Sequence, residues 1–237
     1  MLDLFPEGFE EEESEAGFEL AAYTREPPQR RLGALGPVSV STVEPGWTEA
    51  WKRFHRPVRV GPLWVGPPWE VPDAEAVPVV IDPGRAFGTG AHPTTRLCLE
   101  LLLERQRGSL LDLGCGSGVL GIAAAKLGFS PVVALDSDEA AVEATRANAL
   151  ANGVTVDVRP VDVLSASLPE VDLAVANIAL LVVERLGERL RAPFLIASGY
   201  LAGEALTVPG WRTVERRHAN GWAADLVEAA ERVLLPS

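Results

Sequence analysis

The sequence is poor in the residues that build disulfides and metal sites. Among its 237 residues there are only two cysteines, Cys98 and Cys115, and three histidines. Two well-separated cysteines do not make a disulfide framework, and no cluster of cysteine and histidine has the spacing of metal ligands. We therefore predict no metal site and a reduced, cytoplasmic environment for the chain.

The sequence also lacks an excess of basic residues and a long apolar run. It has 33 acidic against 21 basic residues, whereas a nucleic-acid interface requires clustered Lys and Arg, so we predict no direct nucleic-acid binding. No apolar stretch approaches the roughly 20 residues of a membrane helix, and the acidic N-terminus does not resemble a signal peptide. No membrane association is expected. The net charge of -12 fits either a basic protein substrate or simple solubility.

The chain changes character near Ile81, and the part before it is rich in proline and tryptophan. The patterns predict strands over Gly17–Thr24 and Pro37–Val43 and a short helix over Pro45–His55, whose aromatic side chains we interpret as core. We expect residues 1–55 to form a small α+β domain. The many prolines of residues 56–78 predict a semi-rigid linker with short extended pieces.

Residues 79–237 alternate short apolar runs with Ala- and Leu-rich helical patterns. The predicted strands are Ser109–Leu113, Pro131–Leu135, Thr155–Val161, Val171–Ala176, Phe194–Ser198, Arg212–His218 and Trp222–Glu228. The predicted helices are Arg96–Glu104 (capped by Thr94 or Thr95), Val119–Leu127, Glu139–Asn152 and Ala179–Arg191. The last two strands flank Asn220-Gly221, a hairpin signal. With right-handed crossovers this order gives an α/β fold: an open, mostly parallel, seven-stranded sheet with helices on both faces. Ligands are expected at the carboxyl ends of its strands, after the first of them.

A glycine-rich turn, LLDLGCGSGV from Leu110, joins the first of these strands to a helix. We expect Gly114 to let the chain leave the strand, Gly116 to let a ligand approach the backbone, and Gly118 to allow close packing of helix on sheet. A dinucleotide site is the rival interpretation. The Gly-x-Gly-x-Gly spacing and the carboxylate of Asp112, which suits an ammonium group and repels a pyrophosphate, favour S-adenosylmethionine instead.

Two further aspartates follow the next predicted strands. Asp136 ends the second strand, where a carboxylate can accept hydrogen bonds from both ribose hydroxyls; its alternative role is a helix N-cap, which Ser137 or Asp138 can already provide. Asp162, after the third strand, either meets the adenine edge or is an ordinary turn aspartate.

Three segments carry a resemblance to a known family: VIDPGRAFGTGAHPTT from Val80, DLGCGSGVLGIAAAKLG from Asp112, and VANI from Val175. They resemble the ribosomal protein L-eleven methyltransferases (PrmA), and related protein-lysine methyltransferases share parts of them. The resemblance implies a Rossmann-like class I methyltransferase that uses S-adenosylmethionine to methylate lysine and N-terminal amines of a ribosomal protein. It also implies cofactor contacts at Thr95, Gly114, Asp136 and Asn177, and an N-terminal substrate-recognition domain.

The sequence departs from the family pattern in two places. The N-terminal domain looks shortened, because the segment Leu2–Glu11 resembles the end of the family's first helix. Leu180 stands three residues after Asn177, where the family usually has alanine. These departures leave open a methyltransferase for another protein or a small molecule. A non-catalytic module that binds S-adenosylmethionine is a further alternative, against which the presence of Asn177 counts.

Methyl transfer to lysine requires a neutral amine, although free lysine has a pKa of about 10.4. Asn177 could orient the amine through its side-chain oxygen or through the backbone carbonyls of Asn177 and Ile178; a polar strand cap is its structural alternative. His92 is either a general base or a residue that holds the glycine-rich segment in place. Phe87 could stack on the adenine or face the sulfonium. Gly84, Gly88 and Gly90 suggest a loop that closes over the cofactor, or a sharp connector.

Overall fold

The computed structural model describes residues 10–14, 17–21, 55–82 and 90–230. The chain divides into two compact units, residues 1–51 and 52–237. In the first unit, β1 (Glu10–Ser14) and β2 (Gly17–Ala21) form an antiparallel pair. The strand predicted from Gly17 is confirmed. The segment Leu2–Glu11, which resembles the end of a helix in the family, lies outside the described residues except for Glu10 and Glu11, which belong to β1.

Two elements predicted for the first unit cannot be compared with the structure. The strand expected from Pro37 lies outside the described residues. The helix expected from Pro45 also lies outside them, except for its last residue, His55.

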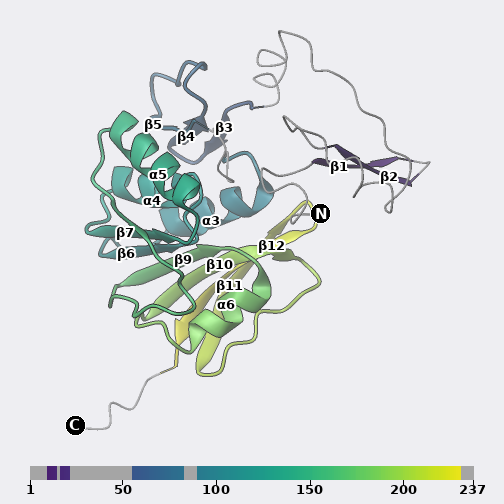
Figure 1. The fold of residues 1–237 in the computed structure, drawn as a ribbon, viewed down its shortest axis with the longest axis vertical. Helices are drawn as coiled ribbons and strands as arrows, with labels where there is room; N and C mark the ends of the chain where they lie inside the picture. The colour runs from purple at the N-terminus through teal and green to yellow at the C-terminus, as the bar shows by residue number, and fades with distance from the viewer. Residues whose placement is uncertain (1–9, 15–16, 22–54, 83–89, 231–237) are drawn as a thin grey trace. The chain divides into compact units, whose positions relative to one another are not determined.

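The second unit is built on a seven-stranded sheet with the order β11-β12-β10-β9-β6-β7-β8 (Figure 1). Its strands are β6 (Leu110–Leu113), β7 (Val132–Asp136), β8 (Asp157–Pro160), β9 (Leu173–Asn177), β10 (Phe194–Leu201), β11 (Trp211–Ala219) and β12 (Trp222–Ala229). Neighbouring strands from β8 to β10 pair in parallel, while β12 is antiparallel to both β10 and β11. The predicted α/β fold with a mostly parallel sheet and a terminal hairpin is therefore confirmed.

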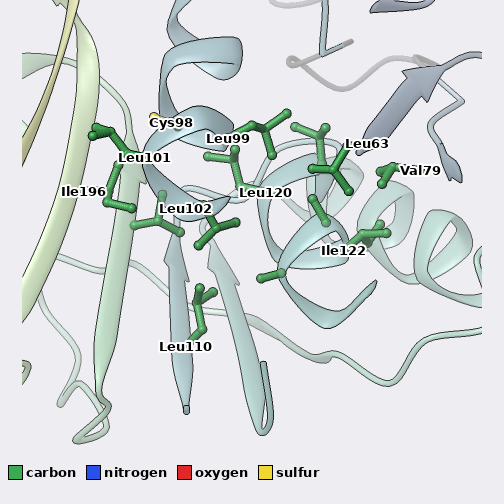
Figure 2. Packing of buried hydrophobic residues seen from close by; sticks show 14 of the residues in the cluster. Leu63, Val79, Cys98, Leu99, Leu101, Leu102, Leu110, Leu120, Ile122 and Ile196 are labelled. Atoms are coloured by element: carbon green, nitrogen blue, oxygen red, sulfur yellow. The ribbon is translucent and has the colours of Figure 1, made fainter. Parts of the chain in front are cut away.

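Helices cover both faces of this sheet because successive residues of its strands point to opposite sides. The helices are α3 (Pro93–Leu103), α4 (Val119–Lys126), α5 (Glu139–Ala151) and α6 (Leu180–Gly187). Leu110 packs with side chains of α3 and α4, as Figure 2 shows, whereas Leu111 packs with Val183 of α6 in a separate cluster. The two faces thus have separate cores, and the β6 strand is buried between them.

The segment predicted as a linker contains a small sheet of its own. It consists of β3 (Val58–Val60), β4 (Leu63–Gly66) and β5 (Val77–Val80), in which β3 pairs antiparallel and β5 parallel with β4. Leu63 and Val79 are buried in the same cluster as α3 and α4, and Figure 2 shows both near Ile122. The segment is therefore packed within the second unit and does not form a spacer. Three of the six prolines that suggested a linker lie in the loop between β4 and β5.

Two helix ends differ from the predictions by three or more residues. Helix α3 begins at Pro93, and His92 rather than Thr94 or Thr95 is its N-cap, since His92 Nδ1 accepts a hydrogen bond from Thr94 N. Proline at the first helical position supports this start. Helix α6 ends at Gly187, four residues early, where the Trp211 indole donates to the Gly187 carbonyl at 2.9 Å.

Candidate functional site

A cavity of about 540 Å³ opens at the carboxyl ends of the central strands. It lies where β6 separates β7 from β9, the point at which the strand order reverses and at which open α/β sheets bind ligands. Its lining comes from the glycine turn, the ends of β7 and β9, the loop after β8 and the start of α6. The lining residues are Thr95, Asp112, Gly114, Cys115, Gly116, Val119, Leu120, Asp136, Ser137, Asp162, Val163, Leu164, Asn177, Ile178, Ala179 and Val182.

The glycine turn needs its glycines for both conformation and space. Gly114 has φ +73°, and a Cβ there would lie 2.6 Å from Cγ2 of Ile178, which also lines the cavity. Gly118, with φ +82°, is the N-cap of α4, and a Cβ there would lie 2.7 Å from Thr145 Cγ2. Gly118 therefore permits close approach of the turn to helix α5, and not only the packing of helix on sheet that we had expected. Gly116 also has a positive φ and lines the cavity.

Asp112 is a buried acid at the cavity wall. Its side chain is 1 % exposed, and its Oδ2 accepts a hydrogen bond from Gly121 N at 2.9 Å. Burial raises the pKa of Asp112 to about 7, although the Gly121 N–H favours the charged form. A cationic ligand group in the cavity would stabilise the ionised carboxylate, as predicted for an ammonium group.

Asp136 ties the end of β7 to the glycine turn. Its Oδ2 accepts a hydrogen bond from Gly116 N at 2.9 Å and its Oδ1 accepts one from Asp138 N at 3.0 Å. The N-cap of α5 is Asp138, whose side chain accepts from Ala140 N. Asp136 therefore does not cap the helix. Each of its oxygens can accept a second hydrogen bond, so the fixed carboxylate can still bind two hydroxyl groups.

Asp162 forms a turn, as one of its two predicted roles required, while its contact with the adenine edge stays a prediction. Its Oδ1 accepts a hydrogen bond from Leu164 N at 2.9 Å, an Asx turn, and the residue also lines the cavity beside Val163 and Leu164. This Asx turn holds the loop after β8 beside the cavity.

Asn177 ends β9 and lines the cavity together with Thr95 of α3. Its Nδ2 donates to Thr95 Oγ1 at 3.3 Å, and Thr95 is 1 % exposed. The next residue, Ile178, donates its backbone N–H to Ser198 O at 3.0 Å. The side chain and the backbone of this turn are thus both held by neighbouring elements.

Gly199 is a residue of the site that sequence reasoning missed. It lies in a bulge of β10, with φ +105°, where the pairing with β12 shifts register. A Cβ at Gly199 would lie 2.3 Å from Ile178 O and 2.9 Å from Ile178 N. Glycine therefore allows the backbone of β10 to pack directly on the turn after Asn177. A lone glycine inside a strand pattern was the available signal.

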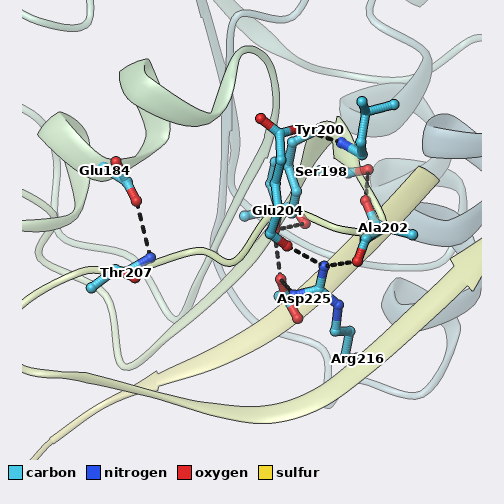
Figure 3. Close-up of polar contacts among 11 residues, drawn as sticks. Glu184, Ser198, Tyr200, Ala202, Glu204, Thr207, Arg216 and Asp225 are labelled. Carbon is cyan, nitrogen blue, oxygen red and sulfur yellow. Dashed lines mark hydrogen bonds and ion pairs between the residues drawn. The ribbon is translucent and has the colours of Figure 1, made fainter. Parts of the chain in front are cut away.

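A buried polar network fixes the chain beyond Gly199 (Figure 3). Tyr200 Oη donates to Asp225 Oδ2 at 2.8 Å, and the Arg216 guanidinium donates to Ala202 O at 3.0 Å. Burial, together with the Asp225 carboxylate, raises the pKa of the Tyr200 phenol. Glu184 of α6 accepts a hydrogen bond from Thr207 N at 3.1 Å. The contacts of Tyr200 and Arg216 join the end of β10 to β11 and β12, and the separate Glu184–Thr207 hydrogen bond ties the following loop to α6.

His92 lies outside the cavity lining and makes structural contacts. Its Nδ1 is 2.7 Å from Thr94 Oγ1, and its ring packs edge-on against Trp222 with centroids 4.9 Å apart. Burial lowers the pKa of His92, so the imidazole is neutral at pH 7. Phe87, Gly84 and Gly88 lie outside the described residues; Gly90 is described and has φ +87°.

Over the residues that the structure describes, no group of three or more His, Cys, Asp or Glu side chains is placed to hold a metal ion. In the same part of the chain, no helix has the length and apolar character needed to cross a membrane.

The sheet order, the cavity at its switch point and the glycine turn together define a class I methyltransferase fold. A crystal structure of a ribosomal protein L11 methylase from Lactobacillus delbrueckii subsp. bulgaricus superposes with a TM-score of 0.64 and 28 % identity; the match covers 74 % of this chain and 100 % of that one.

The chain belongs to the family of the ribosomal protein L11 methyltransferases (PrmA), whose sequence profile matches residues 16–232. A ribosomal protein L11 methyltransferase from Symbiobacterium thermophilum is 42 % identical over 212 residues, which are 82 % of this chain and 70 % of the relative. One from Tolumonas auensis is 44 % identical over 162 residues, 63 % of this chain and 53 % of the relative. The chain thus aligns with between about half and 70 % of the length of these relatives.

Proposed function

We propose that the chain transfers methyl groups from S-adenosylmethionine to lysine and N-terminal amines of ribosomal protein L11, in the cytoplasm. The observation that carries this proposal is the cavity at the switch point, which is lined by three carboxylates and one amide around a glycine turn. Family membership supports the substrate, because the relatives are named for it. We assign residues 1–55 to substrate recognition, as the resemblance implies.

The residues of the cavity fit S-adenosylmethionine. A volume of about 540 Å³ lies within the range of small-molecule sites. The buried carboxylate of Asp112 suits the ammonium group of the cofactor, and the two free acceptor positions of Asp136 suit the ribose hydroxyls. Asp162 and its loop line the same cavity, and we assign them to the adenine edge. When bound, S-adenosylmethionine supplies an electrophilic methyl group on a positively charged sulfur.

The chain's own contribution is to hold a neutral amine in line with that methyl group. Asn177 Nδ2 is engaged by Thr95, so the planar amide directs Oδ1 to its other side, where it can accept an N–H of the incoming amine. Apolar side chains of the lining, such as Val182, exclude water and favour the neutral amine. Positioning of this kind accounts for a large part of the rate of such displacements.

The amine must also lose a proton, and we propose that it passes to His92 or to water. His92 precedes Thr95 by three residues at the start of α3 but does not line the cavity, so a proton would reach its imidazole through intervening water.

Mass spectrometry of purified L11, incubated with the chain and isotope-labelled S-adenosylmethionine, tests the proposal. We expect mass increments of whole methyl groups on lysine or N-terminal amines, and labelling about 100-fold slower with the Asn177→Ala variant. Labelling of another ribosomal protein instead of L11 would contradict the substrate. A chain that binds the cofactor but labels no protein would be a binding module, the second candidate.

A further inference from the structure

Helix α5 carries three buried polar side chains on one face. Thr145, Asn148 and Asn152 are spaced i, i+3 and i+7, and are 0 %, 4 % and 7 % exposed. Buried polar groups need hydrogen-bond partners. Here most of the partners are backbone atoms of two segments that are far from α5 in sequence.

The first segment is the edge of β5 and its continuation. Asn152 accepts from Val80 N at 2.9 Å and donates to Val80 O at 2.6 Å. Asn148 accepts from Asp82 N at 3.0 Å and donates to Asp82 O at 3.3 Å. The spacing of the two amides along the helix matches the spacing of Val80 and Asp82 along the strand, since four residues of helix rise about 6 Å and two residues of strand about 6.6 Å. The two amides therefore pair with β5 as a neighbouring strand would.

The second segment is the glycine turn. Thr145 Oγ1 donates to Gly116 O at 2.9 Å, and Asn148 Nδ2 donates to Ser117 O at 2.9 Å. In a trans peptide the carbonyl and the following N–H point in opposite directions. Anchoring these two carbonyls to α5 therefore fixes two peptide planes of the turn directly after Gly116, which lines the cavity.

We infer that Thr145 and Asn148 are positioning residues for the cofactor, which act by fixing the backbone of the glycine turn. Asn148 is the member of the row that joins the turn to the segment at Asp82, whereas Asn152 anchors β5 without contacting the turn. The inference rests on the proposed function, because it assumes that the turn binds S-adenosylmethionine.

Asn148→Asp and Asn152→Asp make a matched pair for the test. Each substitution keeps the shape of the side chain and its acceptor oxygen, and replaces the donating NH2 group by a second oxygen. Each also adds one buried negative charge, and the two positions lie one helical turn apart. Calorimetry with S-adenosylhomocysteine on the full chain measures affinity, and thermal unfolding measures stability. We expect both variants to unfold at lower temperature. We expect affinity to fall on the order of tenfold in Asn148→Asp and to stay within about twofold in Asn152→Asp.

Thr145→Val provides a milder test. It keeps the branched shape of the side chain but removes the hydroxyl that donates to Gly116 O. We expect a loss of affinity of several-fold, and this variant decides the question if Asn148→Asp does not fold. Equal losses in Asn148→Asp and Asn152→Asp, or wild-type affinity in Thr145→Val, would overturn the inference and leave the row a purely structural feature.

The two proposals fail differently in this experiment. A wild-type chain that does not bind S-adenosylhomocysteine contradicts the proposed function and the inference together. A wild-type chain that binds it, with the Asn148→Asp and Thr145→Val variants unchanged in affinity, contradicts the inference alone.

Discussion

Asn177 Nδ2 donates a hydrogen bond to Thr95 Oγ1 across 3.3 Å, which links the end of β9 to the first turn of α3 at the cavity wall. The contact gives the Asn177 amide a fixed orientation, with its acceptor oxygen available to a substrate. The turn is further held by the hydrogen bond from Ile178 N to Ser198 O.

Asn177→Ala should lower turnover much more than cofactor affinity. Loss of the oriented acceptor should reduce kcat by about 100-fold, because misplacement of the amine is costly. The Kd for S-adenosylhomocysteine should change by no more than a few-fold. Steady-state kinetics and calorimetry measure the two quantities. Thr95→Val, which removes the acceptor for Asn177 Nδ2, should show part of the same loss in kcat. A fully active Asn177→Ala enzyme would exclude a positioning role.

Asp136→Ala should weaken cofactor binding by roughly 1–3 kcal/mol, because charged hydrogen bonds to the ribose are lost and Gly116 N loses its partner. Titration calorimetry with S-adenosylhomocysteine provides the measurement. Asp157→Ala is the matched control, since Asp157 is an exposed aspartate at the start of the adjacent strand β8. If both substitutions leave affinity unchanged, Asp136 is not part of the binding site.

Asp112→Asn should stabilise the protein without ligand at alkaline pH. The pKa of Asp112 in the folded protein is about 7, above the unfolded value near 3.9, so the folded state holds a proton that the unfolded state releases. Its contribution to stability therefore falls as the pH rises from about 4 to about 7, and the loss is complete above that. At pH 8 we expect Asp112→Asn to gain roughly 2–4 kcal/mol over the wild type.

At pH 4 the same comparison should show little difference, which makes acid pH the internal control. Urea denaturation at several pH values measures this. Affinity for S-adenosylhomocysteine should fall in Asp112→Asn, because the carboxylate partner of the ammonium group is gone. Parallel stability curves for the two proteins across this pH range would mean that Asp112 does not titrate there.

Gly199→Ala should reduce both stability and kcat. The added Cβ meets the Ile178 backbone at 2.3 Å, so the turn that carries Asn177 must move. Gly210→Ala is the matched control: Gly210 has φ +78°, but a Cβ there meets no atom within 4 Å. It should cost about 1–2 kcal/mol for the left-handed conformation and leave kcat unchanged. Chemical denaturation and kinetics separate the two effects; equal kcat values for both variants would argue against the packing role of Gly199.

The central sheet could be predicted from local sequence because its strands are short apolar runs between amphipathic helices. The glycine turn after Leu113 could be predicted from the spacing of its glycines. The position of Asp136 could be predicted because it ends the next apolar run. The fold class was therefore accessible without a structure. The cavity then follows from topology, since parallel strands end at one edge.

The contacts that complete the site could not be predicted in this way, because they join residues distant in sequence. Asn148 meets Asp82 across 66 positions, and Asn177 meets Thr95 across 82. Residues 56–78 were assigned as a linker because their prolines outweighed their short strands, although burial against α3 and α4 decides their structure. His92 was weighed as a base, yet its capping of α3 was not foreseen.

The most direct test of the central claim is a crystal structure of the chain with S-adenosylhomocysteine. We expect the ligand in the cavity between the glycine turn and Asn177, with its ribose hydroxyls on Asp136 and its ammonium group near Asp112. A ligand bound elsewhere on the chain, or one in this cavity that contacts neither carboxylate, would contradict the assignment of the site.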